Sequence, residues 1–230
     1  MNNTPFNLTK HVAEYHYDYV TVLDNIVPPP LCDTLKERVE QTIEQGRVKL
    51  VNHQGLGTRE VSDAGGQYLH YIFQGQDVRD HLPELTAIYH SLLPLISLVT
   101  SQDAIVSPHD RSDINIKVYP EGGGTLGEHY DTNAITVLLF LTSNREAPLR
   151  MQIPRAHPSQ PEPWIEHRHI HAKAGSLLIM KGREILHDCE PTVTEKKITV
   201  VLNYYTRDDV WRPEKFDAFV YDGVDPEIAA

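Results

Sequence analysis

The chain has 230 residues, of which 40% are hydrophobic and 23% charged, a composition typical of a globular protein with a sizeable core. Its net charge is −11, with 21 basic residues scattered among 32 acidic ones, which disfavours a nucleic-acid partner. No apolar run approaches the roughly 20 residues of a membrane-spanning helix, so no membrane partner is expected. Cys32 and Cys189 are far apart, and residues 1–19 lack the apolar stretch of a secretory signal. We therefore expect a cytoplasmic protein.

Residues 1–112 are predicted to combine helices with short strands. Residues 18–27 are rich in β-branched side chains, which predicts a strand. A helix is expected over 31–45, where apolar residues recur every four positions before a glycine, and a second helix over 83–99. The glycine-rich stretch 47–80 is interpreted as irregular and strand-like.

Beyond residue 112 the apolar spacing changes to that of β-strands. Ile114, Ile116 and Val118 alternate with polar residues, so one face of this strand is apolar and the other polar. Residues 134–141 form a nearly continuous apolar run, as in a strand covered on both faces. Further short strands are expected at 164–171, 176–180 and 197–205.

The turns between these strands are rich in glycine and proline, and the prolines between positions 148 and 163 are interpreted as an insertion loop. Many short strands joined by such turns predict a sandwich or jelly roll. We expect an α+β protein of one structural domain. Residues 1–112 would support a β core at 113–206, and 207–230 would form a C-terminal extension.

The tripeptide His129-Tyr130-Asp131 is the strongest chemical signal. Its outer residues are two positions apart, so in extended backbone both side chains leave the same face and can reach one ion. His187 is the best candidate for a third ligand from a distant strand, and two imidazoles with one carboxylate suit ferrous iron. The same tripeptide at His16-Tyr17-Asp18 has no such partner downstream and is interpreted as chance.

Lys197 follows His187 by ten residues and begins an alternating strand. In that strand Lys197, Thr199 and Val201 share one face. A lysine that points into a barrel is costly unless it meets an anion, which favours a binding role. The alternative is a surface ion pair between Lys197 and Glu195.

The stretch from Tyr119 through His129, Asp131, His187 and Pro191 to Lys197 resembles the iron(II)- and 2-oxoglutarate-dependent oxygenases, particularly the prolyl-hydroxylase-like branch. The resemblance covers about residues 113–206. It implies a double-stranded β-helix, a jelly-roll or cupin-like core with N-terminal helices packed on it. It also implies Fe(II) as the metal, with 2-oxoglutarate and O2 as co-substrates.

Carried over by position, the resemblance makes His129, Asp131 and His187 the iron ligands and catalytic residues. It places Lys197 at the C5 carboxylate of 2-oxoglutarate, with Tyr119 and Thr199 beside the co-substrate. Many relatives have arginine at the position of Lys197, and a glycine common two residues earlier is Glu195 here. Lys196 therefore remains an alternative to Lys197 as the residue that binds 2-oxoglutarate, although the alternation of side chains along the strand places it on the outer face.

The expected reaction is oxidation, most simply hydroxylation, of an unactivated C–H bond in a small molecule, with formation of succinate and CO2. Asp131 supports hydroxylation, because related halogenases have a small residue there. A peptidyl or prolyl hydroxylase acting on a protein side chain is the first alternative, and a metal-binding cupin without oxygenase activity is the second. Lys197 argues against the plain cupin, which needs no inward cation.

Substrate selection usually depends on variable loops, so the candidates here are the least specific. His167, His169 and His171 share one strand face but have no acidic partner, and we interpret them as a solvated strand. The residues proposed to contact the substrate are Tyr68, His70 and Tyr71 in the glycine-flanked segment, together with Arg59, Trp164 and Arg207.

Overall fold

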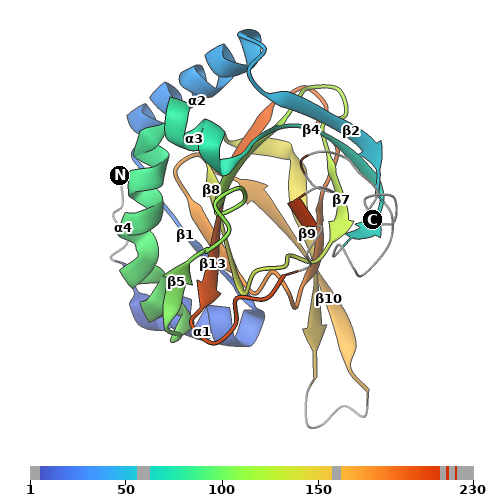
Figure 1. Ribbon diagram of the computed structural model, residues 1–230. Helices are drawn as coiled ribbons and strands as arrows, with labels where there is room; N and C mark the ends of the chain where they lie inside the picture. Colours follow the sequence, from blue (N-terminus) through green and yellow to red (C-terminus); the bar gives the residue numbers. More distant parts are fainter. Residues whose placement is uncertain (1–5, 56–62, 157–161, 213–215, 218–220, 222–230) are drawn as a thin grey trace.

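The computed structural model describes residues 6–55, 63–156, 162–212, 216–217 and 221 (Figure 1). They form two antiparallel sheets that face each other. The larger sheet has the order β1 (Val20–Leu23), β11 (Leu177–Met180), β8 (Ile135–Phe140), β13 (Lys197–Thr206), β6 (Ile114–Tyr119), β4 (Gln67–Phe73) and β2 (Lys49–Gln54), with β5 (Ala104–Val106) paired to β13. The smaller sheet has the order β10 (Trp164–Ala172), β9 (Asn144–Arg155), β12 (Leu186–Cys189), β7 (Leu126–His129) and β3 (Asp63–Gly65). This is the predicted double-stranded β-helix, with sheets that do not close on each other.

Helices cover the outer face of the larger sheet (Figure 1). The two helices expected from sequence are present as α2 (Pro29–Glu44) and α4 (Pro83–Thr100). The sequence analysis missed α1 (Leu8–Asp18), which buries only His11 and Tyr15, and the short α3 (Gly75–His81), which begins with a Gln74–Asp77 capping box. Among the described helices none alone is long and apolar enough to span a bilayer. Taken as a pair with a 114° bend, α3 and α4 meet that criterion by length and composition only.

The alternation along β13 divides the molecule into an outer core and an inner cavity. Ile198, Val200 and Leu202 are fully buried and pack toward the helices. Lys197 and Thr199 point the other way, into the space between the sheets. The parity expected from the sequence is therefore confirmed, and it places polar groups inside the β-helix.

Strand β6 continues this pattern beside β13. Its residues Tyr119 and Lys117 are paired with Lys197 and Thr199, so all four side chains lie on the inner face. Apolar residues close the space between the sheets farther along: Leu138, Phe140, Met151, Leu178 and Met180. The site is consequently a polar chamber with an apolar floor.

The insertion loop expected around the prolines is wrong for Pro148 and Pro154, because both lie inside β9. Strand β12 pairs with β9 only from Leu149 to Gln152, so each proline lies where its missing N–H removes no bond to β12. Pro154 still aligns with Ile165 of β10. Pro148 and Pro154 thus flank the part of β9 that is paired with both β10 and β12. Residues 157–161 lie outside the described part of the chain.

Candidate metal centre

Three side chains converge at the junction of β7 and β12. His129 and His187 are direct partners in the antiparallel register of these strands, and their ring centroids are 4.3 Å apart. Asp131 follows two residues after His129. Its Oδ1 lies 3.6 Å from Nε2 of His129, and its Oδ2 lies 3.5 Å from Nε2 of His187. The ligand atoms of all three lie within 4.8 Å of one another, so one ion can contact each of them.

Backbone carbonyls orient both imidazoles. Nδ1 of His129 lies 2.7 Å from the carbonyl of Gly127, and Nδ1 of His187 lies 2.9 Å from the carbonyl of Ile185. A carbonyl can only accept, so each ring carries a proton on Nδ1 and directs Nε2 toward Asp131. Bonds of this kind fix the tautomer of metal-binding histidines.

The carboxylate is held by its own neighbours. The Thr136 hydroxyl donates to Oδ2 of Asp131, and the Asn133 side-chain amide donates to that hydroxyl over 3.0 Å. The backbone N–H of Asp131 donates to the carbonyl of Gly182 over 3.0 Å. Asp131 is therefore fixed through both its backbone and its side chain.

The electrostatics of the cluster suit a cation. Burial, with the repulsion of His129, lowers the pKa of His187 to about 4, which leaves that ring neutral at pH 7. Burial opposes ionisation of Asp131, but His187, His129 and Thr136 together hold its pKa below the usual range. An ionised carboxylate beside a neutral imidazole is the donor state that a metal needs.

A cavity of about 440 Å³ extends inward from the cluster and contains Lys197, Tyr119 and Thr199 on its walls. Lys197 is only 3% exposed, and its ammonium donates to the carbonyl of Ala147 over 2.8 Å and contacts Sγ of Cys189. The same ammonium lies 5.0 Å from the centre of the Tyr119 ring.

Lys196 points away from this cavity and pairs with Glu40 of α2 over 2.8 Å. The backbone N–H of Arg145, not Lys197, binds the Glu195 carboxylate. Of the two lysines, Lys197 is therefore the one beside the His129–Asp131–His187 cluster, and the surface ion pair with Glu195 does not form.

A second cavity, of about 730 Å³, opens outward from the same cluster. Among the residues proposed for the substrate, Tyr68 and His70 line it. Tyr71 lies on the opposite face of β4 and packs against the core beneath the helices. Trp164 is 41% exposed on β10, and Arg207 pairs with Asp103 over 3.0 Å at the surface. The last three thus lie away from the cavity, and Arg59 lies outside the described residues.

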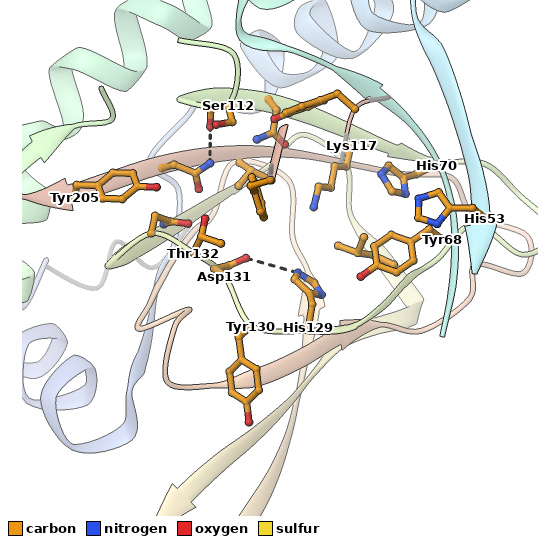
Figure 2. A pocket seen from close by; sticks show the side chains of 17 residues that line it. His53, Tyr68, His70, Ser112, Lys117, His129, Tyr130, Asp131, Thr132 and Tyr205 are labelled. Atoms are coloured by element: carbon orange, nitrogen blue, oxygen red, sulfur yellow. Dashed lines mark hydrogen bonds and ion pairs between the residues drawn. The ribbon is translucent and has the colours of Figure 1, made fainter. Parts of the chain in front are cut away.

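Lys117 (Figure 2) and Asn115 also line the outer cavity and were not among the residues predicted for the site. The signal was present in the alternation of β6, but its polar face was not connected with the chamber. The C-terminal aromatics Phe216 and Tyr221 also reach this cavity. They were not predicted, because the sequence around them shows no regular alternation of apolar and polar residues.

The other histidine motifs lie away from the cluster. His16 is exposed and Asp18 binds Arg155, both in the last turn of α1, as expected for a chance copy of the tripeptide. His167, His169 and His171 are exposed along β10. Among the described residues, one group of three ligating side chains meets the distances for a metal, and it is the cluster described above.

No protein-family model and no curated protein sequence matches the chain. Solved structures do. The non-heme alpha ketoglutarate dependent carbocyclase SnoK from nogalamycin biosynthesis superimposes with a TM-score of 0.69 at 12% identity, covering 97% of this chain and 95% of SnoK. The epimerase SnoN in complex with Fe3+, alpha ketoglutarate and nogalamycin RO gives 0.67 at 11% identity, with coverages of 95% and 92%. A prolyl-4-hydroxylase from Pseudomonas putida gives 0.59 at 14% identity, with coverages of 87% and 99%. The chain therefore has the double-stranded β-helix fold of the iron(II)- and 2-oxoglutarate-dependent oxygenases.

Proposed function

We propose that this protein is an iron(II)- and 2-oxoglutarate-dependent dioxygenase that hydroxylates an unactivated C–H bond of a small molecule. The observation that carries the proposal is the position of the ligand cluster between two cavities. His129 and Asp131 border both cavities, and the inner cavity contains the ammonium of Lys197. A carboxylate-bearing co-substrate and an organic substrate can thus approach one ion from two sides.

The donor set fits ferrous iron. Two imidazoles and one carboxylate are the ligands of a facial triad, the donor set of non-heme iron(II) oxygenases. An ion held by these side chains would be accessible from both cavities, because His129 and Asp131 border each of them, and the hydrogen bonds to Gly127 and Ile185 leave both Nε2 atoms directed at Asp131. Iron and 2-oxoglutarate, when bound, supply the oxidising chemistry with O2 and yield succinate and CO2.

The chain supplies binding, orientation and exclusion of water. Lys197 is fixed by the carbonyl of Ala147 before any ligand arrives, so its charge is positioned for the far carboxylate of 2-oxoglutarate. Tyr119 and Thr199 form the walls beside it. The apolar residues Phe140 and Leu149 line the same space and keep it dry, which strengthens the pairing of charges.

Two observations bear on the alternatives. The outer cavity is bordered by several aromatic side chains with a few polar groups among them, the usual lining of a small-molecule site, which supports a small substrate over a protein side chain. The buried Lys197 supports an oxygenase over a plain metal-binding cupin, because an inward cation is costly unless an anion meets it.

Succinate formation from 2-oxoglutarate under Fe(II) and O2 tests the proposal. Wild-type protein is expected to release succinate, and Asp131→Ala to fall to the background without metal. His16→Ala, at the first histidine of the second copy of the tripeptide, is the matched control and should behave as wild type. Failure of wild-type protein to bind 2-oxoglutarate at millimolar concentration would refute the oxygenase and favour the cupin.

A further inference from the structure

Lys117 lies between the two cavities. It is in the middle of β6, opposite Thr199 of β13, and it borders both the inner and the outer chamber. Figure 2 shows its ammonium directed into the pocket, on the side of His129 and Asp131. The function proposed above gives this lysine no task.

Within the described part of the chain Lys117 has no hydrogen bond and no ion pair. Two lysines of the neighbouring chain segment at β13 differ from it, because Lys197 donates to a carbonyl and Lys196 pairs with Glu40. Burial lowers the pKa of Lys117, while the nearby carboxylate of Asp131 opposes that shift. A largely buried ammonium without a partner raises the free energy of the folded protein unless a bound anion pairs with it.

None of the charges in the proposed holoenzyme is left over to neutralise Lys117. The two positive charges of Fe(II) and the one of Lys197 are balanced by Asp131 and the two carboxylates of 2-oxoglutarate. Lys117 then contributes one positive charge that nothing in the centre neutralises. The remaining reactant is the substrate, so the balance calls for a single negative charge on it.

Two further buried groups beside Lys117 also lack partners. Oδ1 of Asn115 and Nδ1 of His70 have no hydrogen bond, although these residues are only 4% and 2% exposed. Both border the outer cavity together with Lys117, and neither borders the inner one. Buried polar atoms are nearly always paired, so these orphans mark where a polar part of a ligand belongs.

The body of that ligand would be apolar. Large hydrophobic and aromatic side chains make up much of the remaining wall of the outer cavity, namely Tyr68, Leu126, Val201, Tyr205, Phe216 and Tyr221, and the polar residues Ser112, Thr132, Asn133 and Asn203 also border it. Such walls bind a ring or hydrocarbon skeleton, while a few polar groups fix its orientation.

We propose that Lys117, with Asn115 and His70, binds the carboxylate of a monoanionic substrate whose hydrophobic body fills the outer cavity. A single unpaired cation favours a carboxylate over a phosphate, which carries close to two charges. This inference rests on the proposed function, because the charge balance includes iron and 2-oxoglutarate.

The test measures binding of 2-naphthoate and its neutral isostere 2-naphthamide by equilibrium dialysis, using anaerobic protein loaded with Fe(II) and 2-oxoglutarate. Wild-type protein is expected to bind the carboxylate at least about tenfold more tightly than the amide, as for one charge-assisted hydrogen bond. Lys117→Met should remove this preference and change the Kd for 2-oxoglutarate by less than about twofold. Lys117→Arg should retain part of the preference.

Lys173→Met is the control, because Lys173 pairs with Asp24 at the surface and lies away from both cavities. It should leave the preference unchanged. Equal binding of the two probes to wild-type protein would overturn the inference, and so would loss of 2-oxoglutarate binding in Lys117→Met, which would assign the lysine to the co-substrate. If wild-type protein fails to bind Fe(II) and 2-oxoglutarate, the proposed function itself fails, and this inference fails with it.

Discussion

Gly182 lies so close to Asp131 that a Cβ built on it would be 2.2 Å from Oδ2 of the carboxylate. The same atom would be 2.3 Å from the hydroxyl of Thr136, which donates to that carboxylate. The constraint at this position is space, not backbone conformation. Any side chain at residue 182 must therefore displace the acidic ligand or its hydrogen-bond donor.

Gly182→Ala is expected to weaken metal binding by about 10- to 100-fold, the range seen when the support of a ligand is disturbed. Anaerobic calorimetry with Fe(II) measures the change. Gly46→Ala is the matched control, because nothing lies within 4 Å of that position but its φ of +67° disfavours alanine. It should lower stability by about 1 kcal/mol and leave metal affinity unchanged. Equal metal affinity in both variants would contradict the argument.

Thr136→Val removes the donor to Asp131 and the acceptor of the Asn133 amide while keeping the shape of the side chain. The carboxylate then loses one orienting bond, and a buried amide proton loses its partner. We expect metal affinity to fall by at least about tenfold, with stability reduced by about 1 to 3 kcal/mol. Thr136→Ser retains the hydroxyl and should recover most of the metal affinity. No recovery in the serine variant would assign the effect to packing.

Lys197→Met should raise the KM for 2-oxoglutarate by about 10- to 150-fold, as expected for loss of a charge-assisted hydrogen bond of roughly 1.5 to 3 kcal/mol. Succinate release at varied 2-oxoglutarate concentration measures it. Lys196→Met, one residue away, removes only the partly exposed pair with Glu40 and should change KM by less than about twofold. The assignment of Lys197 does not survive if the two variants have similar KM values.

Asp113 gives stability a pH dependence. Burial raises its pKa to about 6 despite hydrogen bonding from the Ile114 N–H and the attraction of Arg79, so the folded state binds this proton more tightly than the unfolded state. Its contribution is therefore most favourable below about pH 4 and is lost as pH rises to about 6, by at most about 3 kcal/mol. Denaturant unfolding of Asp113→Asn should lack this decline. Parallel pH curves for the two proteins would contradict the shift.

The alternation of cavity-facing and core-facing residues along β13 could be predicted from the sequence, because it depends only on residues close together in the chain. The sequence predicted that Lys197 and Thr199 share a face opposite to Ile198 and Val200, and the structure confirms it. The double-stranded β-helix followed from many short strands and from the motif resemblance. By contrast α1 was missed, because its two buried residues are a histidine and a tyrosine and give no apolar stripe.

The substrate side was harder to predict because it depends on pairing between distant strands. Lys117 stands in an alternating strand whose polar face resembled a solvent face, and only the pairing of β6 with β13 turns that face inward. Tyr68, His70 and Tyr71 were proposed together because they are close in sequence, but Tyr71 lies one residue out of step with the other two and so faces the other side of β4. The pairing register between distant strands is thus the information that a single sequence does not provide.

The groups that would hold the metal and the groups that would choose the reactant come from different sheets. His129 and His187 belong to β7 and β12, whereas Lys117 and Asn115 belong to β6 across the chamber. Amino-acid substitutions on the larger sheet can therefore change which substrate binds and leave the metal-binding histidines unchanged. Such a division lets new specificities arise by mutation without first dismantling the catalyst.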